Sequence, residues 1–130
     1  MPQATNITVK NAAGADKVFA LVNPSAGDGG IALWALKEGT ISAVFPQLTA
    51  SAAKTGNRSR KLSVKYRQPS SYTDSVTGLT AVGSAAEVNT TVSIPDDFPE
   101  GLKDDFVAFY TNIVRDALIQ AMFRDAYPAT

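Results

Sequence analysis

Alternating apolar and polar residues predict β-structure over most of the first 95 residues. Ile7 and Val9 alternate with polar neighbours, and the segment NAAGAD that follows is rich in turn formers. Residues 5–22 are therefore predicted to form a β-hairpin. The run IALWALK at 31–37 is predicted to be a strand, because it is short and flanked by glycines.

The same alternation continues to Pro95 and predicts a sheet over residues 31–95. Its clearest strand is the stretch that ends in KLSVKYRQ before Pro69, and a further strand covers 87–94. Between them, residues 70–85 are rich in Ser, Thr and Gly. This segment is predicted to be either a long mobile loop or a loop that contains a short strand.

The pattern changes after Pro95, where residues 97–126 show the apolar spacing of a helix. Asp97 and Glu100 have the spacing of a capping box. One helix over 99–125 would be about 40 Å long, whereas a compact chain of this length has a radius of gyration of about 14 Å. The helix is therefore expected either to pack against a second subunit or to kink, with Thr111–Asn112 as the candidate kink. Strands followed by a helix predict a single α+β domain over 1–130.

Strand alternation gives the predicted sheet two different faces. Leu62, Val64 and Tyr66 share an apolar face, whereas Lys61, Ser63, Lys65 and Arg67 share a polar one. Strands 47–53 and 87–94 divide in the same way. The polar face is interpreted either as a platform for nucleic-acid phosphates and bases or as an ordinary solvated sheet surface.

Charge sharpens this picture. The chain has 12 basic and 12 acidic residues. A run without any acid holds half of the cations: Lys54, Arg58, Arg60, Lys61, Lys65 and Arg67. The absence of Cys and His excludes thiolate or Ser-His-Asp catalysis and the common zinc sites. Paired carboxylates such as Asp104 and Asp105 are explained by the helix dipole, so we expect no enzyme, no catalytic residue, no cofactor and no metal. Neither a signal peptide nor a membrane span is predicted.

The chain resembles the coat proteins of small single-stranded RNA bacteriophages, the levivirus type. The resemblance covers nearly the whole length and rests on the order of these segments: the hairpin followed by LVNP, then GGIALWAL, LTASAAKTGNRSRKLSVKYRQP, a long loop, VNTTVSIP and a helical segment ending in AYP. It implies an N-terminal hairpin, an antiparallel five-stranded sheet and C-terminal helices that pack across a dimer partner. It also implies an icosahedral shell around phage RNA, a virion location with assembly in the bacterial cytoplasm, and no membrane or small-molecule partner.

The resemblance further implies where RNA binds. In that family an unpaired adenine sits in a pocket on the inner sheet face, lined by an aliphatic residue, hydroxyls and a lysine. The matching residues here are Ile31, Thr49, Ser51, Ser63 and Lys65. Further RNA contacts are expected from Arg58, Lys61, Arg67 and Asn89. In relatives the same face also grips an RNA hairpin and represses replicase translation.

The chain departs from the family at some of these positions. Glu87 stands where some relatives have a tyrosine that stacks on a base, and a carboxylate repels phosphate. Gln47 and Ala53 replace basic residues, whereas Arg67 adds charge where some relatives carry an acid. General RNA packaging is therefore expected more firmly than recognition of the same hairpin. A free-standing single-stranded RNA-binding dimer is the alternative, although such proteins usually expose aromatic residues for base stacking.

Overall fold

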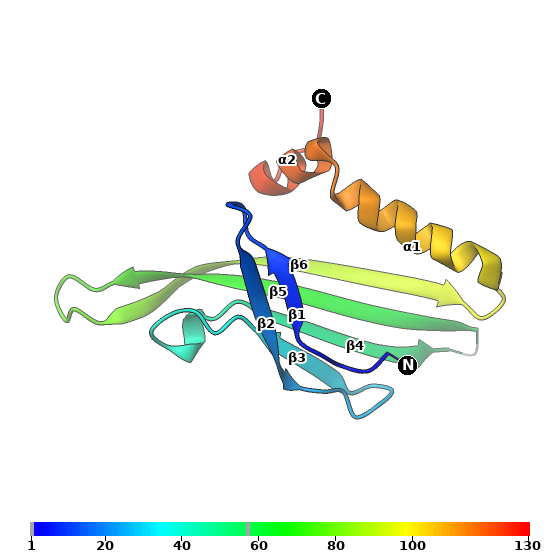
Figure 1. Cartoon of the computed structure of the whole chain (residues 1–130), viewed down its shortest axis with the longest axis horizontal. Helices are drawn as coiled ribbons and strands as arrows, with labels where there is room; N and C mark the ends of the chain where they lie inside the picture. The colour runs from blue at the N-terminus through cyan, green and yellow to red at the C-terminus, as the bar shows by residue number, and fades with distance from the viewer. Residues whose placement is uncertain (1, 57) are drawn as a thin grey trace. The chain divides into compact units, whose positions relative to one another are not determined.

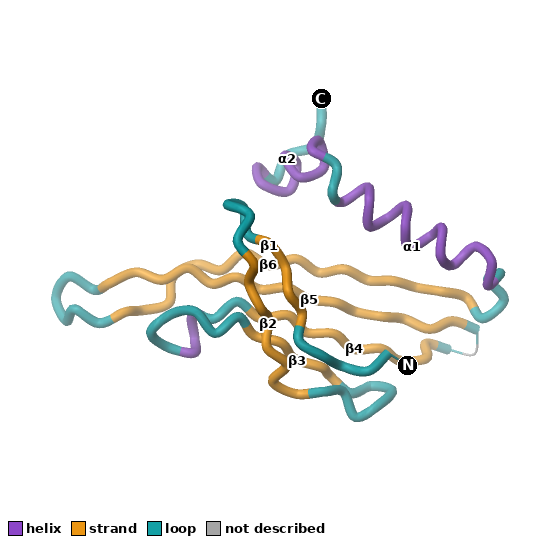
Figure 2. Tube along the Cα trace, viewed as in Figure 1, coloured by secondary structure: helices purple, strands orange, loops and turns teal. Residues whose placement is uncertain are grey.

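The computed structural model describes residues 2–56 and 58–130. They form two compact units, one ending at Ile94 and the other comprising Pro95–Thr130. The first contains all the strands and the second contains both α-helices, as Figure 2 shows.

The first unit is an antiparallel sheet in which the strands follow one another in chain order. Its six strands are β1 (Ile7–Lys10), β2 (Asp16–Asn23), β3 (Ile31–Ala35), β4 (Gln47–Thr55), β5 (Ser59–Thr73) and β6 (Thr80–Pro95). A short 3₁₀ turn, Ser42–Val44, precedes Pro46 and β4. The expected α+β fold is confirmed, with six strands in the sheet instead of five. The hairpin is continuous with the rest of the sheet because β2 pairs with β3.

The N-terminal hairpin is held by its turn and curls over one face of the sheet. The Asn11 side-chain oxygen accepts hydrogen bonds from the backbone N–H groups of Ala13 (3.0 Å) and Ala15 (2.9 Å). The β2–β3 register shifts after Leu21, and such irregularities bend a strand. Figure 1 shows the hairpin crossing the long strands. Phe19 accordingly meets Tyr66 of β5 edge to face, with 6.1 Å between the ring centres.

Strands β5 and β6 are longer than the sequence indicated. Most of the segment 70–85 is strand, and only residues 74–79 form a loop. The Asp74 carboxylate caps this turn by accepting from the N–H groups of Val76 (2.7 Å) and Thr77 (3.3 Å). The prediction of a long mobile loop is therefore wrong. A composition rich in Ser, Thr and Gly predicts a loop, whereas pairing with a neighbouring strand lets these residues extend the sheet.

The second unit contains α1 (Glu100–Val114) and α2 (Ala117–Asp125). A kink at Thr111–Asn112 was the wrong position, because Thr111 stays helical and its hydroxyl donates to the Val107 carbonyl at 2.9 Å. The break comes at 115–116, where Asp116 caps α2 by accepting from the Leu118 N–H at 2.9 Å. The predicted capping box is also absent. A turn closed by the Phe98 N–H and the Pro95 carbonyl (3.1 Å) delays the helix start to Glu100.

The described part of the chain has a small hydrophobic core. Its buried apolar residues are Phe19, Ala32, Ala35 and Val44. No residue of α1 or α2 is buried, and Phe106, Phe109 and Phe123 are among the exposed side chains. Helices of this length are marginal in water without tertiary packing of their apolar face. Both helices therefore present apolar surface that a partner can cover.

Candidate nucleic-acid interface

The pairing of β3, β4 and β5 builds the polar face of the sheet in rows. Residues directly opposite each other on adjacent antiparallel strands point to the same face. One row consists of Ile31, Ser51 and Ser63, and the next row consists of Leu33, Thr49 and Lys65. The two rows are neighbours, because their members are two residues apart along each strand.

These two rows bring together the five residues expected to form a base pocket, which we call the pocket cluster: Ile31, Thr49, Ser51, Ser63 and Lys65. The side-chain hydroxyl of Thr49 also lies 3.5 Å from the Lys65 carbonyl and donates to it. Ile31 is 57% exposed despite being aliphatic. The cluster thus combines an accessible apolar side chain, three hydroxyls and one ammonium group, which suits a base that stacks at its face and hydrogen-bonds at its edge.

The register adds Leu33, which the sequence analysis did not single out. It lies directly opposite Thr49, within the second row. Its position two residues after Ile31 was the available signal, because residues i and i+2 of a strand share a face. Leu33 is only half-buried, so it extends the apolar part of the cluster.

The other residues predicted to contact RNA lie on β5, on β6 and in the turn before β5. Lys61 lies opposite Ala53, and Arg67 lies opposite Gln47, so both share the polar face. Asn89 follows Glu87 by two residues on β6 and is exposed. Arg58 is not on a strand: it lies in the turn before β5, where it is exposed. The structure therefore places Arg58 at the end of the face and the other cations along β5.

Two cations of the basic run lie on the opposite face. Lys54 and Arg60 pair with each other in the register, one residue out of phase with Lys61. Arg60 forms an ion pair with Asp28 in the loop before β3. The hydrogen bond that the Arg60 guanidinium donates lowers the pKa of the Asp28 carboxyl below its ordinary value of 3.8. Arg60 therefore ties that loop to β5.

Glu87 forms ion pairs on the polar face that its place in the sequence did not predict. Its carboxylate reaches the ammonium group of Lys65 at 3.7 Å and the Nε of Arg67 at 3.5 Å. The sequence predicts a residue that cannot stack on a base and that repels phosphate, but it does not predict these two ion pairs. The alternation of β5 and β6 was the signal, because Lys65, Arg67 and Glu87 are all at positions expected on the polar face.

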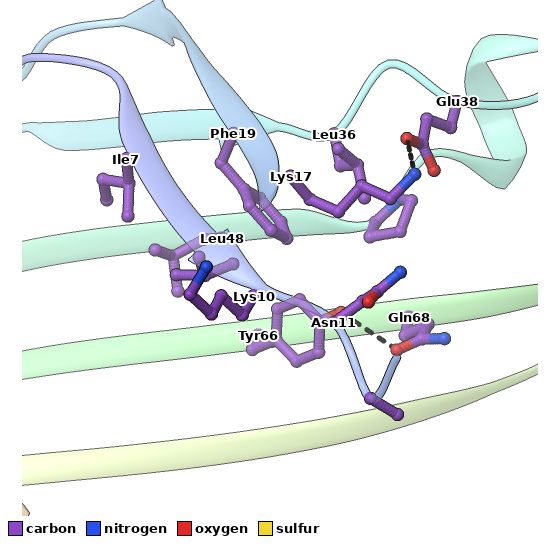
Figure 3. Close-up of a pocket in the computed structure, with 13 residues that line it drawn as sticks. Ile7, Lys10, Asn11, Lys17, Phe19, Leu36, Glu38, Leu48, Tyr66 and Gln68 are labelled. Atoms are coloured by element: carbon purple, nitrogen blue, oxygen red, sulfur yellow. Dashed lines mark hydrogen bonds and ion pairs between the residues drawn. The ribbon is translucent and has the colours of Figure 1, made fainter. Parts of the chain in front are cut away.

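The apolar face carries a hollow of about 680 Å³ under the hairpin. Figure 3 shows Phe19 and Ile7 from the hairpin above Leu48 and Tyr66 from the sheet. Burial raises the pKa of the Tyr66 phenol above its ordinary value of 10.0, and the phenol donates to Gln68 at 2.9 Å. Tyr66 faces away from Lys61, Lys65 and Arg67, so it is not part of the pocket cluster.

The family profile described as levivirus coat protein matches residues 2–128. The chain belongs to the levivirus coat protein family. This coat protein is thus a structural capsid subunit and not an enzyme. The suspected family is confirmed. No curated protein matches the sequence.

Solved structures with the same fold are phage particles. The coat protein is similar to the virus-like particle of bacteriophage NT-214, with a TM-score of 0.84 and 18% identity over 99% of this chain and 100% of that one. The virus-like particle of Beihai levi-like virus 21 matches with a TM-score of 0.83 and 17% identity, over 99% of this chain and 99% of that one. The bacteriophage GA protein capsid matches with a TM-score of 0.68 and 17% identity, over 93% of this chain and 94% of that one. At these identities the likeness concerns the fold.

Among the residues that the structure describes, no group of three or more Asp and Glu side chains is placed to hold a metal ion. Within the same residues, neither α-helix is long and apolar enough to cross a membrane.

Proposed function

We propose that this coat protein dimerises, assembles into an icosahedral shell and holds phage single-stranded RNA against the polar face of its sheet. The observation that carries the RNA part is the register of β3, β4 and β5, which puts the pocket cluster and Lys61, Lys65 and Arg67 on one face. The family and the particle structures of similar chains support the assembly part. The site of action is then the virion, with assembly in the bacterial cytoplasm.

The free edge of β6 supports dimerisation. This strand, Thr80–Pro95, is the last in the sheet order and is 16 residues long. An edge strand of this length presents unpaired backbone groups and is a template for another chain. A second copy pairing along it would continue the sheet and place two polar faces side by side.

The apolar surfaces support the same dimer. Leu102, Phe106 and Ile113 of α1 are exposed, and the hollow under the hairpin is lined mainly by apolar side chains. Exposed apolar patches of this kind mark interaction sites. In the proposed dimer the helices of one subunit cover the apolar sheet face of the other, as the family resemblance implies.

The charge distribution supports RNA on the opposite face. Neutral overall charge allows copies to pack, while Lys61, Lys65 and Arg67 concentrate cations where phosphates would lie. Hydroxyl groups of the pocket cluster can bond to bases or sugar. General packaging of RNA follows from this arrangement. Repression of replicase translation is a narrower proposal, since Glu87 replaces the stacking tyrosine found in some relatives.

The test is the size and RNA content of the purified recombinant protein. Electron microscopy and light scattering should show uniform hollow particles, and ultraviolet absorbance should show nucleic acid inside them. A stable dimer that binds RNA but never assembles, over a range of salt and protein concentrations, would support the alternative of a free-standing RNA-binding dimer. If the protein neither assembles nor binds RNA, the polar face is an ordinary solvated sheet surface and the proposed function is wrong.

A further inference from the structure

Glu87 lies between two of the cations that the proposed function assigns to RNA. The geometry points to Glu87 as an affinity-limiting residue: its carboxylate competes with RNA phosphates for Lys65 and Arg67, so that the shell discriminates against RNA that offers phosphates alone. This inference rests on the proposed function. It adds a residue that sets how strongly, and how selectively, the basic face holds RNA.

The ion pairs have the geometry of a bridge. One carboxylate oxygen of Glu87 lies 3.7 Å from the Lys65 ammonium, and the other lies 3.5 Å from the Arg67 Nε. Each oxygen therefore serves a different cation. Both distances exceed those of charge-assisted hydrogen bonds, so the contacts are loose enough for another oxyanion to replace them.

All three side chains are accessible to a ligand. The exposed side-chain fractions are 48% for Lys65 and 41% for both Arg67 and Glu87. Exposed ion pairs contribute little to folding stability. Strands β5 and β6 are already neighbours joined by backbone hydrogen bonds. The bridge is therefore not needed to hold the sheet together, and its main effect is on charge.

A phosphate that approaches Lys65 and Arg67 must compete with another oxyanion, the Glu87 carboxylate. Carboxylate and phosphate oxygens bind guanidinium and ammonium groups in similar ways. RNA must displace Glu87 or bind beside its negative charge, and either lowers affinity. Lys61 differs, because among the described residues it has no ion-pair partner. The cost of displacing Glu87 is thus confined to Lys65, a member of the pocket cluster, and Arg67, which lies one row beyond it.

Such a cost falls unequally on different RNAs. An RNA that places a base in the pocket cluster gains contacts that offset the competition, whereas an RNA bound through phosphates alone does not. Specificity is a difference between affinities and is often increased by a repulsive element. Glu87 supplies that element within reach of Lys65, which is itself a member of the cluster.

The variant Glu87→Gln removes the charge and keeps the shape. Two exposed ion pairs, each worth a factor of about 1.5–5, predict that it binds a mixed-sequence single-stranded RNA about 2- to 25-fold more tightly. The slope of log K against log salt should steepen by about 0.7 for each phosphate newly neutralised. Binding is measured by fluorescence anisotropy of a labelled RNA with subunits released from particles.

Glu38→Gln is the matched control. Glu38 is also exposed and also pairs with a lysine, Lys17, at 2.7 Å, but it borders the hollow on the apolar face. The control removes the same charge, so equal tightening by both variants would mean a general charge effect and would overturn the inference. In an Arg67→Ala background the gain from Glu87→Gln should shrink, whereas in a Lys61→Ala background it should persist.

Unchanged or weaker RNA affinity in Glu87→Gln also overturns the inference. If that variant does not fold, as judged by circular dichroism, Glu87→Thr replaces it, because threonine suits an edge strand. The proposed function fails separately. It fails if the wild-type protein binds no RNA, whereas wild-type binding together with equal affinity in Glu87→Gln refutes only the role of Glu87.

Discussion

Removing the cations from the polar face should weaken RNA binding and leave the dimer intact. The change is Lys61→Ala, Lys65→Ala and Arg67→Ala together. All three residues lie opposite residues of β4 on the polar face, whereas Tyr66 and Phe19 form a contact on the other face. The substitutions therefore remove phosphate contacts without touching the surface proposed for dimerisation.

The size of the effect follows from counterion release. If four cations per subunit, namely these three and Arg58, each neutralise one phosphate, log K falls with log salt with a slope of about −2.8 on single-stranded RNA. Raising salt from about 50 mM to about 200 mM then weakens binding about 50-fold. The triple variant keeps only Arg58, so its slope should be about −0.7 and its loss about threefold. Because Glu87 pairs with two of the cations, the slope of the wild-type protein should be less steep than about −2.8.

The assay is a salt titration of RNA binding, with dimer size measured by light scattering after size-exclusion chromatography. The triple variant leaves Glu87 without its partners, so the same titration is run with Glu87→Gln added, to separate lost cations from an exposed acid. An unchanged salt slope would refute the placement of RNA on this face. Loss of the dimer would show that the polar face belongs to the subunit interface.

Two further predictions concern stability. Phe19→Ala should lower the free energy of unfolding by about 3 kcal/mol in a urea titration, because Phe19 is only 8% exposed and packs on Tyr66. The control is Val18→Ala, which should lower it far less because the neighbouring Val18 is 47% exposed. Equal losses of stability in the two variants would contradict the packing of Phe19. The second prediction is a pH effect: since the folded-state pKa of Asp28 is lowered by Arg60, its contribution to stability is present above the ordinary value of 3.8 and is lost as pH falls through the lower, folded-state pKa. Asp28→Asn should remove that part of the acid sensitivity, and an identical pH profile for both proteins would contradict it.

The sequence predicted the faces of the sheet well because strand alternation is local. Once residues 61–67 were identified as a strand, Leu62 and Lys61 had to point to opposite faces. The observed β4–β5 register agrees with this at every paired position from Gln47 to Lys54. The five members of the pocket cluster were named by family resemblance, and the register places them in two adjacent rows. Their role in binding RNA stays a prediction.

The parts that the sequence missed depend on strand pairing between distant segments and on one local helix cap. The strand content of 70–85 comes from pairing of β5 with β6, which Ser, Thr and Gly composition does not reveal. The helix break at 115–116 depends on a local cap, because Asp116 can compete for backbone N–H groups. The Glu87 bridge required knowing that β5 and β6 are neighbours and in which register they lie. In each case, secondary-structure propensity alone does not determine which strands pair or which residue caps a helix.

The basic run spans the end of β4, a turn and β5, and it distributes its charges over two faces. Its six cations therefore cannot all meet RNA: Lys54 and Arg60 lie on the apolar side, and Arg60 is engaged by Asp28. Three cations remain on the polar face of β5, and Glu87 pairs with two of them, Lys65 and Arg67. The charge available to RNA is therefore much smaller than the composition of the run indicates. Under the proposed function this arrangement predicts a moderate affinity for RNA, because fewer phosphate contacts give weaker binding with a smaller salt dependence.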